Sequence, residues 1–223
     1  MSTSRAAAGS RLETPRAAGV AGLVFSALFV VSVVLLRSRP EAGSNADEIA
    51  HFYLEENGGK VGLVGLYLVP FSGIAFLWFI ATVRHHMGDR EDRFFATVFL
   101  GSGLLFVAML FAAAASAGAL TAAVKFQDAP APSADAVSLA RALGFAFLFV
   151  FGVRIAAVFM IVVSMIGLRT GFLPRWLVMA GFASGVAFLL TVTYFELLVL
   201  ILPAWVSAVS IVILRADRRE SSV

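Results

Sequence analysis

The sequence predicts an all-α integral membrane protein, built as a bundle of six transmembrane helices. Long apolar stretches make up nearly all of the chain, and short charged loops separate them. Charged residues account for 14% of the chain, whereas water-soluble domains average about 25%. The mean hydropathy is +0.93. No polar segment reaches the roughly 40 residues that an unaided soluble core needs.

Each predicted span has about 20 apolar residues, the length that crosses a hydrocarbon core of about 30 Å. Charged residues bound most of these stretches; the first, for example, begins after Arg16 and ends before Arg37. The six spans are expected to cover about residues 17–36, 61–83, 96–122, 142–168, 176–194 and 197–214. Residues 1–16 and 216–223 are then short tails of one membrane domain over residues 17–215.

The last two spans are predicted from one long apolar run between Trp176 and Leu214, which only Glu196 interrupts. As a single helix this run would extend about 58 Å, nearly twice the thickness of the hydrocarbon core. Two helices that turn near residues 193–196 fit better, with Tyr194 as an aromatic anchor at the membrane interface. Five spans, one of them broken or strongly tilted, is the weaker alternative.

The distribution of cationic residues predicts that both termini lie in the cytoplasm of a bacterium, whose plasma membrane the chain spans. Six spans place eleven arginines on the side of the termini and five Lys and Arg residues on the other side. Cytoplasmic loops carry such an excess of positive charge. The first span is expected to stay as an uncleaved anchor. Its apolar run is longer than that of a signal peptide, and Leu36 and Arg37 offer no small-residue cleavage site.

The first outer loop is predicted to contain a short amphipathic helix. Residues 44–48 supply a capping side chain followed by acids, which is typical of a helix start. Ile49, Phe52 and Tyr53 then recur at helical spacing, and residues 57–59, Asn-Gly-Gly, are expected to end the helix. Such a helix would lie on the outer membrane surface or over the mouth of the bundle.

Arg154 is the strongest candidate for a functional residue, because it falls near the middle of the fourth span. A central arginine costs about 2.5–3.5 kcal/mol on insertion scales and normally faces the protein interior or a wet cavity. Glu196, Tyr67 and Tyr194 are the further candidates for a ligand site or a pathway around it. A structural interior arginine and a substrate or anion site are both consistent with the sequence.

Two other patterns predict how the spans pack. Gly181 and Gly185 form a G-x-x-x-G pattern, which lets two helices approach closely. Packing within the chain is favoured for this pair, and a dimer seam is the alternative. Pro70 and Pro203 interrupt the second and sixth predicted spans, where each is expected to free a backbone carbonyl and kink its helix.

The sequence predicts no catalytic residue, no metal site and no cofactor. Cysteine is absent, so no disulfide or thiolate metal site can form. His85 and His86 are adjacent and lack the i, i+4 spacing of a helical metal pair. There is no nucleotide-binding loop, zinc motif or nucleophile elbow. Nucleic acid is not an expected partner; membrane lipids are, together with a second copy of the chain or another membrane protein.

Two segments of the sequence carry a family resemblance. They are residues 46–53, followed by Leu77-Trp78-Phe79 and Arg84, and residues 168–176, followed by Trp205-Val206 and Ser210. Together they resemble a family of uncharacterised actinobacterial multi-pass membrane proteins, grouped as a domain of unknown function, over about residues 17–215. The resemblance implies a six-span fold and no activity, so no catalytic residue is carried over.

Three classes of function are consistent with these features. The first is a non-catalytic membrane protein that binds a lipid or lipophilic molecule or serves as a subunit of an envelope complex. The second is a small transporter or channel in which Arg154 lines the pathway. The third, an intramembrane enzyme, is the least favoured, because no set of polar residues recurs across the spans as intramembrane catalysis would need.

Overall fold

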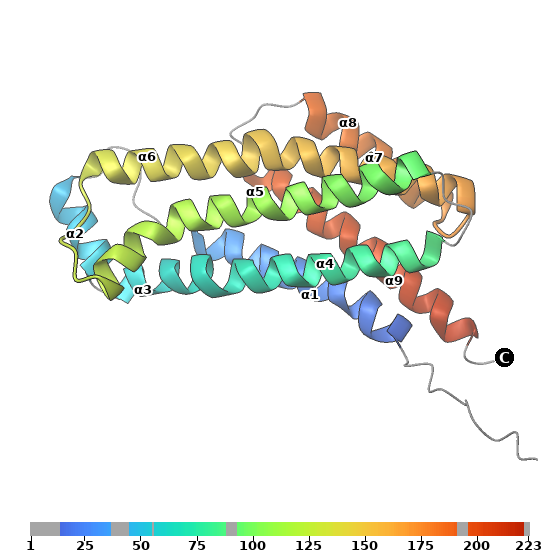
Figure 1. Ribbon diagram of the computed structural model, residues 1–223, viewed down its shortest axis with the longest axis horizontal. Coiled ribbons are helices and arrows are strands. Elements are labelled where there is room, and N and C mark those ends of the chain that lie inside the picture. Colours follow the sequence, from blue (N-terminus) through green and yellow to red (C-terminus); the bar gives the residue numbers. More distant parts are fainter. Residues whose placement is uncertain (1–13, 37–44, 55, 88–92, 191–195, 221–223) are drawn as a thin grey trace, which may run out of the picture.

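The computed structural model describes residues 14–36, 45–54, 56–87, 93–190 and 196–220, and every regular element in these ranges is a helix (Figure 1). The all-α class predicted from the sequence is confirmed. In chain order the elements are α1 (Thr14–Leu36), α2 (Ala46–Leu54), α3 (Glu56–Leu63), η1 (Val64–Leu68), α4 (Val69–Met87), α5 (Arg93–Phe126), α6 (Ala134–Phe145), η2 (Ala146–Gly152), α7 (Val153–Thr170), α8 (Arg175–Leu190), η3 (Glu196–Leu200) and α9 (Ile201–Glu220).

Five of the helical runs are long and apolar enough to cross a membrane. They are Gly19–Leu36, Lys60–His85, Arg93–Phe126, Ala134–Thr170 and Leu198–Ala216. Of the predicted fifth span, the structure describes α8, which has 16 residues and extends about 24 Å; residues 191–194 of that span lie outside the described residues. The described residues therefore hold five membrane-length helices and one shorter apolar helix, where the sequence predicted six spans. The predicted turn, with Tyr194, falls mostly on residues 191–195, outside the described residues.

Two of the long runs pass without a break through a wider π-helical segment, η1 in one and η2 in the other. At the end of η1, the N–H of Val69 donates to the carbonyl of Val64, five residues earlier. Pro70 follows directly. In a regular helix its ring would clash with the carbonyl four residues before it, and the wider turn gives that carbonyl room. The interruption predicted at Pro70 thus takes the form of a π-helical turn.

The second predicted interruption, at Pro203, lies in the first turn of α9, directly after the short helix η3. A proline is tolerated in a first turn, because the N–H that it lacks would have no partner in the helix. The hydroxyl of Ser26 donates to the carbonyl of Pro203 at 2.8 Å, and this bond links α1 to α9.

The long helices form one bundle in which α4, α5 and the α6–η2–α7 run lie roughly side by side (Figure 1). α1 packs against both α4 and α9, and α8 packs along α7. Phe76 lies at the centre of the core: its ring centroid is 4.7 Å from that of Phe25, 5.8 Å from Phe79, 5.1 Å from Phe106 and 5.2 Å from Phe159. These rings join α1, α4, α5 and α7.

The short helix α2 covers one end of the bundle, as Figure 1 shows. Its buried side chains Ile49, Phe52 and Tyr53 form a small apolar cluster with residues of α3, α5 and α6. A helix is thus found where the sequence predicted one after residue 44. The predicted end is wrong, because residues 57–59 lie in α3, which leads into the next long run. Packing against α5 outweighs the low helix propensity of the two glycines.

The start of α2 is fixed by a reciprocal cap, which gives a first testable prediction. Asn45 Oδ1 accepts from the N–H of Glu48 at 2.8 Å, and the Glu48 carboxylate accepts from the N–H of Asn45 at 3.3 Å. Replacing Asn45 by Ala is expected to cost about 1 kcal/mol of local stability. Amide hydrogen exchange over residues 46–54 should then become several-fold faster. Asn45→Ser keeps a capping acceptor without placing a second carboxylate beside Glu48, and it should exchange much like the parent; equal rates in both variants would contradict the cap.

Candidate functional site

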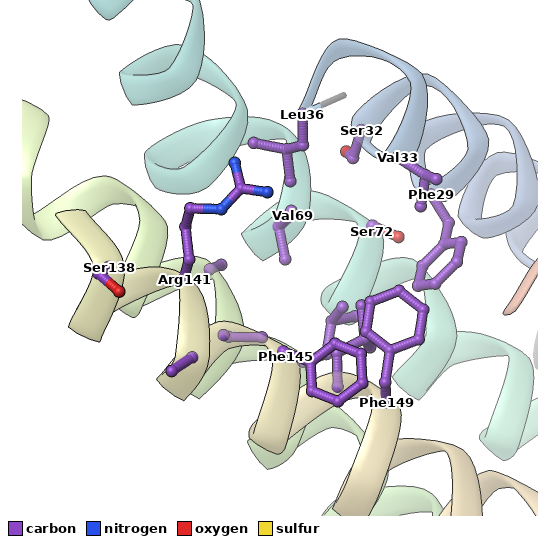
Figure 2. A pocket seen from close by; sticks show the side chains of 16 residues that line it. Phe29, Ser32, Val33, Leu36, Val69, Ser72, Ser138, Arg141, Phe145 and Phe149 are labelled. Carbon is purple, nitrogen blue, oxygen red and sulfur yellow. The ribbon is translucent and has the colours of Figure 1, made fainter. Parts of the chain in front are cut away.

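A cavity of about 440 Å³ lies between α1, α4, α5, α6 and η2 (Figure 2). Sixteen side chains line it, most of them apolar. They are Phe29, Ser32, Val33, Leu36, Val69, Ser72, Leu110, Ala113, Ala114, Ser138, Arg141, Ala142, Gly144, Phe145, Leu148 and Phe149. The volume lies within the range of about 300–1,000 Å³ that is typical of small-molecule sites.

The cavity is built by helical spacing along α6 and η2. The hydroxyl of Ser133 accepts from the N–H of Ala136 at 3.2 Å and so caps α6, which begins well before the predicted span. From this start, Ser138, Arg141, Phe145 and Phe149 follow at intervals of three or four residues and share one helix face. The rings of Phe145 and Phe149 stack at 5.2 Å and form part of the cavity wall (Figure 2).

The polar groups of the cavity differ in what they can offer a ligand. The Ser32 hydroxyl donates to the carbonyl of Leu28 at 2.7 Å, and the Ser72 hydroxyl donates to the carbonyl of Phe25 at 3.3 Å. Each of these hydroxyls therefore has only its oxygen lone pairs left for a ligand. Arg141 is half-buried and is the charged residue among the sixteen. Its guanidinium carries a permanent positive charge and five N–H donors.

The described lining holds few groups that take part in acid–base chemistry. The described lining contains no carboxylate or imidazole that could take up or release a proton in the physiological range. The lining therefore combines one guanidinium, that of Arg141, with a mostly apolar wall. The described residues also contain no group of three His, Asp or Glu side chains that could hold a metal ion.

Of the four predicted site residues, the structure describes the side chains of two, Arg154 and Tyr67. Arg154 lies half-buried at the start of α7, and its Nη1 donates to the carbonyl of Val150, four residues earlier. Tyr67 lies on η1 with 54% of its side chain exposed. Neither residue lines the cavity, and no hydrogen bond or ring contact within the described residues joins them. Tyr194 and the side chain of Glu196 fall outside the described residues.

Gly181 and Gly185 both lie against α7, on the face that α8 presents to the bundle. A Cβ atom at Gly181 would meet the hydroxyl of Ser164, and it would lie 2.8 Å from Nε1 of Trp205. A Cβ atom at Gly185 would lie 3.0 Å from the carbonyl of Ala157 and 2.6 Å from Ile161. Both glycines thus allow α8 to approach α7 closely within the chain.

Ser164 belongs to a set of buried polar groups that sequence reasoning missed. Within the described part of the chain, the buried hydroxyls of Thr121, Ser164 and Ser210 have no hydrogen-bond partner. Each of these residues lies against a glycine of a neighbouring helix: Thr121 against Gly62, Ser164 against Gly181 and Ser210 against Gly22. Small polar residues facing glycines are typical of membrane helix contacts, where they allow the backbones to approach. This pairing becomes visible only when the helix partners are known.

Arg141 was also missed as a site residue, because the sequence placed it at the boundary of the fourth span. A signal for it was present: the spacing of Ser138, Arg141, Phe145 and Phe149 already describes one helical face with a polar and an apolar half.

Comparison of the chain with family models, with curated proteins and with solved structures gives no match.

Proposed function

We propose that the chain is a non-catalytic, multi-pass protein of the bacterial plasma membrane that binds a lipid or lipophilic ligand in the cavity of Figure 2. The observation that carries the proposal is the cavity itself: about 440 Å³ and lined mainly by apolar side chains. In a membrane, such a space fills with an acyl chain or a similar apolar group more readily than with water.

The proposed topology has six spans and both termini in the cytoplasm. Two observations support it. Arg84, Arg93, Arg169 and Arg175 lie at helix ends opposite the end that α2 covers, and such an excess of arginine marks the cytoplasmic side. The sixth crossing is the shorter helix α8, which packs against α7. The bundle end at α2 then faces outward. Six spans is also the count that the family resemblance of residues 46–53 and 168–176 implies.

A transport pathway through Arg154 has less support. The guanidinium is bound to a carbonyl of its own helix, beside the wide turn η2, and it does not line the cavity. We therefore propose a structural role for Arg154, in which the side chain satisfies a backbone carbonyl near the π-helical turn.

The test of the proposed function fills the cavity from two different helices. Gly144→Leu extends from α6, where a Cβ atom meets nothing closer than 3.7 Å, and Ala113→Phe extends from α5. We expect each variant to lose the co-purified lipid that native mass spectrometry detects on the parent. Gly101→Leu is the matched control, because a Cβ atom at Gly101 has no neighbour within 4 Å. Equal lipid retention in all four proteins would contradict the proposal.

A further inference from the structure

A groove of about 460 Å³ lies between α1 and α4, and it is separate from the cavity of Figure 2. Nine side chains line it, all of them aliphatic or aromatic. They are Val20, Ala21, Val24, Leu28, Leu68, Phe71, Ile74, Ala75 and Trp78. All nine belong to the membrane-length runs Gly19–Leu36 and Lys60–His85, so the groove faces hydrocarbon when these runs cross a bilayer.

The groove and the cavity are lined by neighbouring residues of the same two helices. On α1, Leu28 lines the groove and Phe29 lines the cavity. On the other side Leu68 lines the groove, and Val69, the next residue, lines the cavity. Successive residues of a helix point about 100° apart, so the two hollows flank one contact between helices. We call this contact, of residues 28–29 with 68–72, the α1–α4 seam; Figure 2 shows its cavity side, with Phe29, Val69 and Ser72 labelled.

The packing between α1 and α4 is tighter beside the seam than at it. Phe25 and Phe76 meet with their ring centroids 4.7 Å apart, and a Cβ atom at Gly22 would lie 2.7 Å from the ring of Phe79. At the seam, the hydroxyl of Ser72 donates to the carbonyl of Phe25 at 3.3 Å. Bonds between a hydroxyl and an oxygen are usually about 2.7–2.8 Å long, so this one holds the two helices weakly.

The helix on one side of the seam has a point at which it can bend. The wide turn η1 ends at Leu68, the N–H of Val69 reaches back to the carbonyl of Val64, and Pro70 has no N–H to donate. Sharp bends in helices occur at π-helical turns and at prolines. A small rotation of α4 about this point would widen the seam and join the groove to the cavity.

From this arrangement we infer that the α1–α4 seam is a lateral portal, through which the acyl chain of a membrane phospholipid passes from the bilayer into the cavity. The groove is the surface on which the chain docks before it enters. This inference rests on the proposed function and deepens it, because it names the route of the ligand and the source from which the ligand comes.

The groove suits an acyl chain better than a second transmembrane helix. Helices in membranes approach closely across small side chains, and only Ala21 and Ala75 of the nine lining residues are small. A flexible chain can lie between the larger ones. From Leu68 to Trp78 the groove extends about 15 Å, which is half of a hydrocarbon core of about 30 Å. This length matches the depth of the acyl chains of one leaflet.

The test measures how fast bound lipid exchanges. Protein with its co-purified lipid is diluted into mixed micelles that contain chain-deuterated phosphatidylethanolamine, and native mass spectrometry follows the fraction of deuterated lipid on the protein. Ala75→Phe fills the groove and should slow exchange by about tenfold, a change of about 1.4 kcal/mol in the barrier. The amount bound at equilibrium should change far less, because the cavity keeps its lining. Ala108→Phe is the matched control, because Ala108 is exposed on α5 and lines neither hollow.

A second variant opens the seam and adds no bulk. Ser72→Ala removes the bond to the Phe25 carbonyl and should speed exchange by about fivefold, the effect of one net hydrogen bond. Ser102→Ala is its control: the buried Ser102 hydroxyl donates to the carbonyl of Val98 in its own helix at 2.7 Å, and this residue lines neither hollow. Its exchange rate should equal that of the parent. Ser72→Ala needs no new space, so it decides the question even where Ala75→Phe fails to fold.

Slower exchange in Ala75→Phe and faster exchange in Ser72→Ala, with both controls unchanged, support the portal. A parent-like rate in Ser72→Ala overturns it and places the entry elsewhere, while lipid retained by the parent still supports the proposed function. A parent that carries no lipid removes both. Native mass spectra also report the number of copies: a dimer that Ala75→Phe dissociates would place a second copy of the chain in the groove and overturn the inference.

Discussion

Replacing Phe76 by Ala is expected to destabilise the bundle by about 3–5 kcal/mol, the range for truncating a fully buried phenylalanine. The side chain is 0% exposed, and its ring contacts rings from α1, α4, α5 and α7. Lipid tails are as apolar as the core of the bundle, so the hydrophobic effect contributes little to this difference in stability. The lost stability comes mainly from broken dispersion contacts. Four helices lose a shared packing partner at once, and the cavity that remains cannot collapse easily.

The measurement is unfolding of purified protein in mixed micelles, followed by circular dichroism as the fraction of denaturing detergent rises. Phe71→Ala is the matched control, because Phe71 lies on the same helix with 58% of its side chain exposed. We expect its midpoint to stay close to that of the parent. A similar shift for the two variants would show that the aromatic cluster does not hold the four helices together.

The second large effect is expected at Gly181. Gly181→Leu should destabilise the protein by about 3 kcal/mol, the upper part of the usual range for overpacking. The added side chain would occupy the space of the Ser164 hydroxyl and would press on Trp205, whose Nε1 donates to the carbonyl of Leu177 at 3.3 Å. The contacts of α8 with both α7 and α9 are therefore disturbed together.

Limited proteolysis and the micelle unfolding midpoint both report this change. Gly101→Leu is the same substitution at a glycine with open space around it, and it should leave both measurements unchanged or slightly improved. Ser164→Ala is an informative companion. Its hydroxyl has no partner, so its removal should cost little. Parent-like behaviour of Gly181→Leu would mean that α8 does not dock on α7 through this glycine.

Strong local patterns predicted the helical part of the fold. The long apolar runs specify helices, because a membrane leaves no other way to satisfy the backbone groups of a single spanning segment. The start of α2 was predicted from Asn45 and the acids after it, since that cap uses only neighbouring residues. Its end was not, because the fate of residues 57–59 depends on packing against α5, which lies far away in the sequence.

The cavity could be predicted only in part. The spacing of Arg141, Phe145 and Phe149 was visible in the sequence, and it specifies one helical face. Whether this face lines a cavity depends on which helices pack opposite it. Here those helices include α1 and α4, which contribute Phe29 and Ser72 to the lining. Arg154 attracted attention because a central charge is costly in lipid. Its guanidinium donates to the carbonyl of Val150 in the same helical run. A hydropathy pattern does not reveal this hydrogen bond.

The central claim is that the α6–η2–α7 run crosses a bilayer, with the α2 end of the cavity on one side. The chain has no cysteine, so single cysteines can be labelled without background. Ser133 and Thr170 are both exposed and lie at the two ends of this run. A membrane-impermeant maleimide should label Ser133→Cys in intact cells and Thr170→Cys only after permeabilisation. Labelling of both cysteines from the same side would contradict the account.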